Sequence, residues 1–182
     1  MKDLSLHILD IAQNSIRAKA TFVEVSIVED IALDLFSITI KDNGRGIAAD
    51  ILEHVTDPFY TSRTTRKVGL GLSLLKQNAE RCEGSFTINS EVNVGTVVVA
   101  KFKHSHIDRP VLGDIAGVMV ILVTSNPDMD FVYSHRYNQR NYVFRTKEVR
   151  EVLDGIPIND LSVSRFLKEM IKENLDAIKI DV

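Results

Sequence analysis

The chain has 182 residues, of which 45% are hydrophobic, and this fits one domain with an appendage rather than a disordered segment. Its formal net charge of -3 gives no electrostatic reason to expect bulk attraction to nucleic acid or to an anionic membrane. Cys82 is the only cysteine and the first residues lack the pattern of a secretory signal, so we expect a cytoplasmic protein without disulfides. The longest apolar run is far shorter than the roughly 20 residues that span a bilayer, so we expect no membrane segment.

The N-terminal part of the chain carries helical and strand-like patterns in turn. Residues 4–18 carry apolar and small side chains at helical spacing, which predicts an amphipathic helix. Alternating apolar and polar residues predict strands at 23–27, 36–40, 85–90 and 95–102. We therefore expect an α+β fold in which a four-stranded antiparallel sheet is covered by helices on one face.

Glycines mark two irregular segments between these strands. Asp42-Asn43-Gly44-Arg45-Gly46 follows the second strand and predicts a loop of close approach, with a short helix at 49–55. Residues 56–67 show no sustained periodicity, which predicts a long loop of the kind that often serves as a lid. Gly69-Leu70-Gly71 then begins a helix, and we expect Gly84 to cap its end in a left-handed conformation.

The character of the sequence changes near residues 104–111, where His, Asp and Pro residues indicate a linker. We therefore divide the chain into a first domain at 1–104 and a C-terminal α+β extension at 105–182. The extension is expected to contain an apolar element, a hairpin and two helices, at 112–124, 131–145, 146–153 and 161–178. The apolar stripe of the last helix could pack on its own domain or on a second copy, so a homodimer is left open.

Polar residues on the first predicted helix form a candidate catalytic face. His7, Asp10, Asn14 and Arg17 are spaced so that they project from one side of the helix. Such a stripe is by itself more often a solvated face. Asn14 nevertheless offers an oxygen ligand for Mg2+, and Asp10, one turn earlier, could orient a water. For His7, a hydrogen-bonded structural role outweighs phosphorylation.

Two further segments could hold a nucleotide. Asp42 at a strand end could accept a hydrogen bond from the exocyclic amine of a planar base, although Asp-Asn-Gly alone is usually a plain turn. Gly69-Leu70-Gly71 offers free backbone N–H groups at the positive end of a helix, and these attract phosphate. The neighbouring loop adds Arg63, which could fold over the phosphates or merely solvate the surface. No Walker A loop or dinucleotide glycine motif occurs in the sequence.

The order of these segments resembles the boxes of the GHKL family, which includes histidine kinases, a class of heat-shock chaperones, gyrase and MutL-type ATPases. The segments resemble the N box, the first glycine box, the phenylalanine box, the second glycine box and the final Gly-Thr, at residues 10–15, 42–47, 57–61, 69–72 and 95–96. The resemblance covers residues 4–102 and is longest with histidine kinases. It implies the Bergerat fold, a two-layer α/β sandwich with an antiparallel or mixed sheet.

The resemblance also implies ATP and Mg2+ as ligands and gives roles to particular residues. Asn14 would ligate Mg2+, Asp42 would read the adenine amino group, and Thr96 would support that contact. The glycine boxes would surround the nucleotide, through Gly44, Gly46, Gly69, Leu70, Gly71 and Leu72. Arg63 would reach the phosphates from the lid, and Asp10 would be the catalytic base.

Asp10 departs from the family pattern, because members that hydrolyse ATP usually have Glu at this position. Asp is one methylene shorter, and a base must come within about 3 Å of the water that it activates. The resemblance therefore leaves several functions open. The chain could be a catalytic module that transfers phosphate to an unidentified protein or to water, an ATP-gated switch that signals to a partner with little chemistry, or a module that no longer binds ATP.

Overall fold

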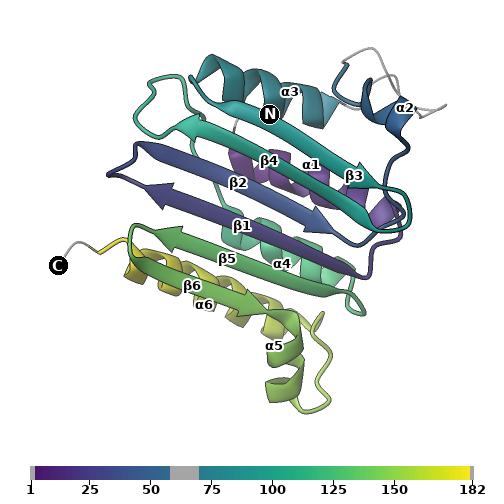
Figure 1. The fold of residues 1–182 in the computed structure, drawn as a ribbon. Helices are drawn as coiled ribbons and strands as arrows, with labels where there is room; N and C mark the ends of the chain where they lie inside the picture. Colours follow the sequence, from purple (N-terminus) through teal and green to yellow (C-terminus); the bar gives the residue numbers. More distant parts are fainter. Residues whose placement is uncertain (1–2, 58–69, 181–182) are drawn as a thin grey trace.

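Figure 1 shows the computed structural model of the chain, which describes residues 3–57 and 70–180. The helices and strands follow in the order α1 (Leu4–Arg17), β1 (Phe22–Asp30), β2 (Leu35–Asp42), α2 (Ala49–Leu52), α3 (Leu70–Arg81), β3 (Ser85–Glu91), β4 (Gly95–Lys103), α4 (Ile115–Ser125), β5 (Asp130–Tyr137), β6 (Arg140–Arg145), α5 (Thr146–Leu153) and α6 (Leu161–Ile178). Every helix and strand predicted from the sequence is present, and the apolar segment of undecided type forms α4.

The described strands form a six-stranded mixed sheet in the order β3-β4-β2-β1-β5-β6. The four strands of the N-terminal part pair antiparallel, as predicted. β5 joins them by parallel pairing with β1, where Val25 lies opposite Tyr133, and β6 pairs antiparallel with β5. The hairpin expected in the extension therefore continues the same sheet, and the predicted α+β fold with a mixed sheet is confirmed.

Helices α1, α3, α4 and α6 lie on one face of the sheet, as Figure 1 shows. The alternation in β1 explains this arrangement, because Val23, Val25 and Ile27 are buried while Glu24 and Ser26 between them stay partly exposed. Burying one such aliphatic side chain stabilises the fold by about 1.5–3 kcal/mol. The buried side chains point toward the helices, so the core lies in that layer.

α4 packs between α1 and α6 and is apolar on nearly all sides. A helix that is buried on several sides needs apolar residues all round, so its sequence shows no helical stripe. This is why periodicity alone left the segment undecided between helix and strand. Neither α4 nor any other described helix combines the length and the apolar content needed to cross a membrane.

Gly84 does not take the left-handed conformation that the sequence predicts for the end of α3. Glu83 has that conformation instead, with φ of 54°. A Cβ at Gly84 would lie 1.8 Å from the carbonyl oxygen of Lys101 on β4. The prediction was wrong about conformation, and Gly84 is needed because the turn into β3 passes directly against the neighbouring strand.

The predicted linker at residues 104–111 is fastened to the start of α1. The backbone N–H of Leu4 donates to the carbonyl of Val111 at 2.9 Å, and that of Ser5 donates to Leu112 at 2.8 Å. The first turn of a helix has free N–H groups that need partners, and this segment supplies them. The extension therefore makes direct contact with α1, which is the helix that carries the predicted catalytic face.

Glu29, which is 5% exposed near the end of β1, joins the extension to the rest of the sheet. Its carboxylate accepts hydrogen bonds from His135 Nε2 at 2.8 Å and His104 Nε2 at 3.0 Å, and Lys179 Nζ lies 2.7 Å away. Burial alone would raise the pKa of Glu29, but the donors from His135, Lys179 and His104 hold it well below the ordinary 4.5. The segments that carry His104, His135 and Lys179 therefore meet at the buried carboxylate of Glu29.

Candidate functional site

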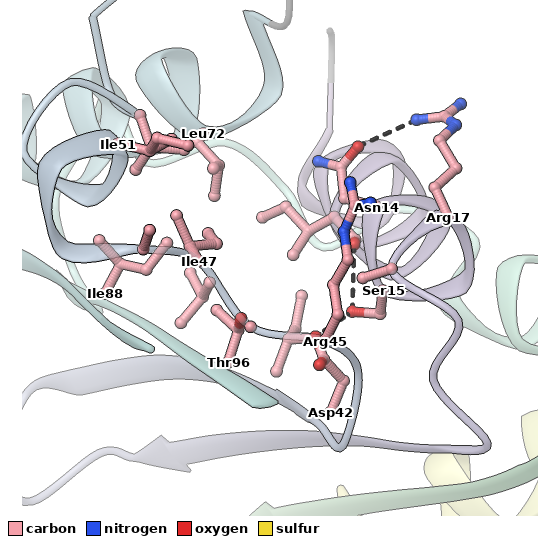
Figure 2. A pocket seen from close by; sticks show the side chains of 17 residues that line it. Asn14, Ser15, Arg17, Asp42, Arg45, Ile47, Ile51, Leu72, Ile88 and Thr96 are labelled. Atoms are coloured by element: carbon pink, nitrogen blue, oxygen red, sulfur yellow. Dashed lines mark hydrogen bonds between the residues drawn. The ribbon is translucent and has the colours of Figure 1, made fainter. Parts of the chain in front are cut away.

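A cavity of about 630 Å³ opens between α1, the loop after β2, α2 and the first turn of α3. Its volume lies within the range of roughly 300–1,000 Å³ that is usual for small-ligand sites. Figure 2 shows apolar side chains on one wall, among them Ile47, Ile51, Leu72 and Ile88, and polar side chains at the floor and on the α1 side. This division suits a ligand with a planar apolar part and a charged part.

Asp42 ends β2 at the floor of the cavity and is 8% exposed. Ser15 Oγ donates to its Oδ2 at 2.6 Å, and the Gly44 N–H donates to its Oδ1 at 2.8 Å. These two bonds fix the orientation of the carboxylate, and each of its oxygens can accept one more hydrogen bond. An ionised carboxylate only accepts, so this position at the floor of the cavity is suited to a donor group.

Thr96 lies across from Asp42, in register on the neighbouring strand β4 (Figure 2). Its Oγ1 lies 2.8 Å from Ser90 Oγ on β3. Ser90 Oγ also donates to the carbonyl of Gly95 at 2.9 Å and accepts from the Ile47 N–H at 2.8 Å. Ser90 therefore ties the loop after β2 to β4, and Thr96 is held beside Asp42.

Gly46 gives the loop after β2 its sharp turn. It has φ of 69°, and a Cβ at this position would lie 2.0 Å from the carbonyl oxygen of Glu91. A side chain here would therefore push the loop away from β3. At the other side of the loop, the Arg45 N–H donates to the carbonyl of Ala18 at 2.9 Å, and a Cβ at Gly44 would lie 2.9 Å from Ala18 Cβ. The loop is thus held between α1 and the end of β3.

Asn14 reaches the rim of the cavity from the last turns of α1. Its Oδ1 accepts a hydrogen bond from Arg17 Nη1 at 2.9 Å, as Figure 2 shows. Mg2+ prefers oxygen ligands, so this amide oxygen fits a metal, which would replace the guanidinium as its partner. Arg17 lines the cavity too, and Arg45 extends toward Asn14 from the loop after β2 (Figure 2).

Asp10 lies one turn before Asn14 and contacts the first turn of α3. A Cβ at Gly71 would lie 1.8 Å from Asp10 Oδ2, so the missing side chain of Gly71 lets the carboxylate approach. Leu72 follows and lines the cavity, whereas Leu70 is partly exposed to solvent. Within the part of the chain that the structure describes, Asp10 therefore lies beside the cavity and not in its wall.

The structure brings together most of the residues that the sequence predicts for the site. Its cavity wall contains Asn14, Asp42, Gly46, Leu72 and Thr96. Gly44, Gly71 and Asp10 lie next to that wall. Arg63, Gly69, residues 58–61 of the phenylalanine box and residues 58–67 of the predicted lid lie outside the described residues, so their roles stay predictions.

Comparison with known families identifies the domain that carries this cavity. The model of the histidine kinase-, DNA gyrase B-, and HSP90-like ATPase family matches residues 2–106, more than half of the chain. The chain belongs to this family. Its ATPase domain thus contains α1, α3 and the four antiparallel strands that surround the cavity.

Individual relatives of this ATPase domain include sensor kinases. Sensor histidine kinase YvrG of Bacillus subtilis is 28% identical over 94 residues, which are 50% of this chain and 16% of that protein. Sporulation kinase D of the same bacterium is 37% identical over 92 residues, or 50% of this chain and 18% of that protein. The chain therefore spans less than a fifth of the length of these relatives.

Solved structures show the same fold. The Aquifex aeolicus MutL ATPase domain complexed with ADP superposes with a TM-score of 0.50 at 19% identity, and the match covers 85% of this chain and 70% of that one. The N-terminal domain of a DNA repair protein gives a TM-score of 0.56 at 18% identity, over 80% of this chain and 52% of that one. At these identities the likeness concerns the fold alone.

Sequence reasoning missed several residues of the ATPase-domain cavity. Ser15 was included in the N box but was given no role in the site, although it supports Asp42. Arg45 stands between the two glycines of the first glycine box, which could have marked it as a residue of the cavity rim. Of the apolar wall, Leu72 and Ile47 lie in the glycine boxes, whereas Ile51 and Ile88 had no such signal, because they come from separate segments that only folding brings together.

Proposed function

We propose that the ATPase domain binds ATP together with Mg2+ in the cavity between α1 and α3 and acts as a catalytic module. The observation that carries this proposal is Asp42, an oriented and acceptor-only carboxylate at the cavity floor, which suits the exocyclic amine of adenine. Thr96 beside it would support that contact. The apolar wall opposite would hold the planar base.

The charged end of the nucleotide would lie toward α1 and α3. Asn14 would supply an oxygen ligand to Mg2+, which keeps several of its waters and offsets the charge of the phosphates. Backbone N–H groups of Leu70, Gly71 and Leu72 begin α3 and would face those phosphates. Gly69 and Arg63 join this set on the family pattern alone.

We propose a kinase activity of the histidine kinase-like or anti-sigma-like kind, or slow hydrolysis of ATP. The γ-phosphoryl group would pass to an unidentified protein acceptor or to water, and ADP would be left. Asp10, which touches Gly71 at the start of α3, would orient the attacking group. Its short side chain favours slow transfer to water. A cytoplasmic location, where ATP and Mg2+ are both available, is part of this proposal.

An ATP-gated switch is the second candidate function. It is favoured by the contacts of α1, which carries Asn14 near one end and binds residues 111–112 of the extension at the other. In this case nucleotide binding would alter the way that residues 105–182 meet a protein partner. The division of the chain into a nucleotide part at 1–104 and a reporting part at 105–182 is proposed on the same ground.

Replacing Asp42 by Asn tests nucleotide binding. The amide would present a donor to the donor group of adenine, and losing one charged hydrogen bond costs about 1.5–3 kcal/mol, so we expect binding at least about tenfold weaker. Isothermal titration calorimetry with ATP and Mg2+ measures this. Asp128→Asn, an exposed position before β5, is the matched control and should bind like the wild type. Equal affinity of Asp42→Asn and wild type would refute the proposed adenine contact.

Replacing Asp10 by Asn separates catalysis from switching. Without a carboxylate to orient the attacking group, we expect single-turnover transfer to fall about 100-fold or more. Assays with γ-labelled ATP, in the presence and absence of candidate acceptor proteins, follow labelled protein and released phosphate. If wild-type protein binds ATP but yields neither product, the catalytic proposal fails and the switch remains.

A further inference from the structure

His7 lies on the side of α1 that faces α3, and it is 1% exposed. Its Nε2 lies 3.2 Å from Asn78 Nδ2 on α3. An amide nitrogen can only donate, so Nε2 must be the acceptor in this contact, and the proton of the neutral ring lies on Nδ1. The contact between the two helices therefore depends on an unprotonated Nε2.

The other ring nitrogen of His7 has no comparable bond. Nδ1 is buried and makes no hydrogen bond to any residue that the structure describes. Burial lowers the pKa of His7 below 6.5, and the backbone of Gly71 and the charges of Asp10 and Asp3 oppose this shift to a smaller extent. The ring is therefore neutral at physiological pH.

Few charged groups face His7. Asp3 caps the start of α1 and Asp10 lies on it, about one turn before and after His7. α3 presents the uncharged Asn78 and the backbone of Gly71, and α4, which also packs on α1, has no ionisable residue between its ends. Among the described residues, a proton on His7 would therefore be offset by the backbone of Gly71 and by these two carboxylates.

The position of α3 against α1 decides the geometry of the proposed nucleotide site. α1 carries Asn14 and the Ser15 that supports Asp42, whereas Leu72 in the first turn of α3 lines the opposite side. His7 is not in the cavity wall, but its contact with Asn78 joins the two helices. We propose that His7 is a positioning residue whose neutral ring keeps the start of α3 in its nucleotide-binding place, so that nucleotide binding and protonation of His7 oppose each other.

The physical reason is that a protonated ring disrupts the contact. Both nitrogens of His+ are donors, so Nε2 would meet the donor nitrogen of Asn78, and the present hydrogen bond would be lost unless the Asn78 amide turned to present its oxygen. The added positive charge would also lie near the positive end of α3. Since coupling between two binding events is reciprocal, a proton that weakens nucleotide binding must itself be released by nucleotide. This inference rests on the proposed function.

The first test measures the pKa of the His7 ring by NMR in the full chain, with and without ADP and Mg2+. We expect nucleotide to lower it by about 0.5 or more, which corresponds to at least threefold antagonism. A histidine with a purely structural role would titrate alike in both samples. An unchanged pKa in nucleotide-saturated protein would overturn the positioning role and leave ATP binding untouched.

The second test compares His7→Ala with His7→Gln by calorimetry from about pH 8 to about pH 5.5. His7→Ala removes the acceptor and should weaken binding of ADP with Mg2+, and the neutral acceptor of His7→Gln should restore most of the loss. The nucleotide phosphate also titrates in this range, so the decisive quantity is the difference between wild type and His7→Gln. Wild-type affinity should fall more steeply in acid. Parallel profiles would overturn the inference, and a wild type that binds no nucleotide would overturn both proposals.

Discussion

Ser15 connects the orientation of Asp42 to the position of α1. Its hydroxyl donates to Asp42 Oδ2 at 2.6 Å, although the two residues are 27 positions apart in the chain. Only the Gly44 N–H otherwise holds the carboxylate among the hydrogen bonds of the described residues. A shift of α1 would therefore turn the group that is proposed to read adenine.

Replacing Ser15 by Ala should weaken ATP binding about threefold to tenfold. The carboxylate of Asp42 would lose one of its two donors and its fixed orientation, and such a bond to a charged group contributes about 1.5–3 kcal/mol, part of which water would recover. Calorimetry with ATP and Mg2+ gives the affinity. Ser164→Ala on α6 is the control for a serine in a helix, because among the described residues its hydroxyl bonds only to the carbonyl of Asp160. If both variants bind ATP equally well, Ser15 has no part in orienting Asp42.

At the scale of elements, α1 and α3 meet through a contact that leaves no room for a side chain. A Cβ at Gly71 would lie 1.8 Å from Asp10 Oδ2, far inside van der Waals distance. In most helices Ala is favoured over Gly by about 1 kcal/mol. Here the clash opposes that gain, so the start of α3 or the Asp10 side chain must move.

Replacing Gly71 by Ala should therefore weaken binding of ADP with Mg2+ about tenfold, because the N–H groups proposed to face the phosphates would shift. Calorimetry measures the loss. The double variant Gly71→Ala, Asp10→Ala removes the opposing carboxylate and should recover most of the affinity. If the double variant binds as weakly as Gly71→Ala, the clash is not the cause.

Elements with a clear stripe could be predicted from the sequence alone. α5 and α6 were predicted at 146–153 and 161–178, and the structure has them at Thr146–Leu153 and Leu161–Ile178. α4 could not be decided, because a helix buried on several sides has no polar face. The conformation of Gly84 was predicted wrongly. A glycine is needed there because the backbone passes close to β4, and no local sequence pattern reveals that contact.

At the scale of the whole molecule, Glu29 holds the extension to the nucleotide-binding part. Its carboxylate accepts from His104 directly after β4 and from His135 on β5, and it pairs with Lys179 at the end of α6. The four side chains are scattered between residues 29 and 179, so their meeting could not be predicted from the sequence. The parallel pairing of β5 with β1 was missed for the same reason, whereas the antiparallel sheet of neighbouring strands was predicted.

Replacing Glu29 by Gln should lower the free energy of unfolding by about 2 kcal/mol at neutral pH, because charged hydrogen bonds to a buried carboxylate are lost. Its folded pKa lies below 4.5, so the unfolded chain takes up the proton first as the pH falls. The stability that Glu29 contributes is thus complete above about pH 4.5 and is lost progressively below it. Urea unfolding at several pH values should show the two proteins converging in acid.

Glu83→Gln is the matched control for this experiment. Glu83 also pairs with a lysine, Lys103, but its side chain is 62% exposed, and such surface pairs contribute little. We expect no measurable change in the free energy of unfolding. A loss at Glu29→Gln that stays constant down to about pH 3 would contradict the assignment of a low pKa to Glu29.

In the proposed complex, Asp42 binds the base of ATP while Asn14 and the start of α3 hold its charged end. A crystal structure of the full chain with an ATP analogue and Mg2+ tests it most directly. We expect the exocyclic amine within hydrogen-bond distance of the Asp42 carboxylate and Mg2+ bound to Asn14 Oδ1 in place of Arg17. A cavity that stays empty at saturating nucleotide, or a nucleotide bound elsewhere, would contradict it.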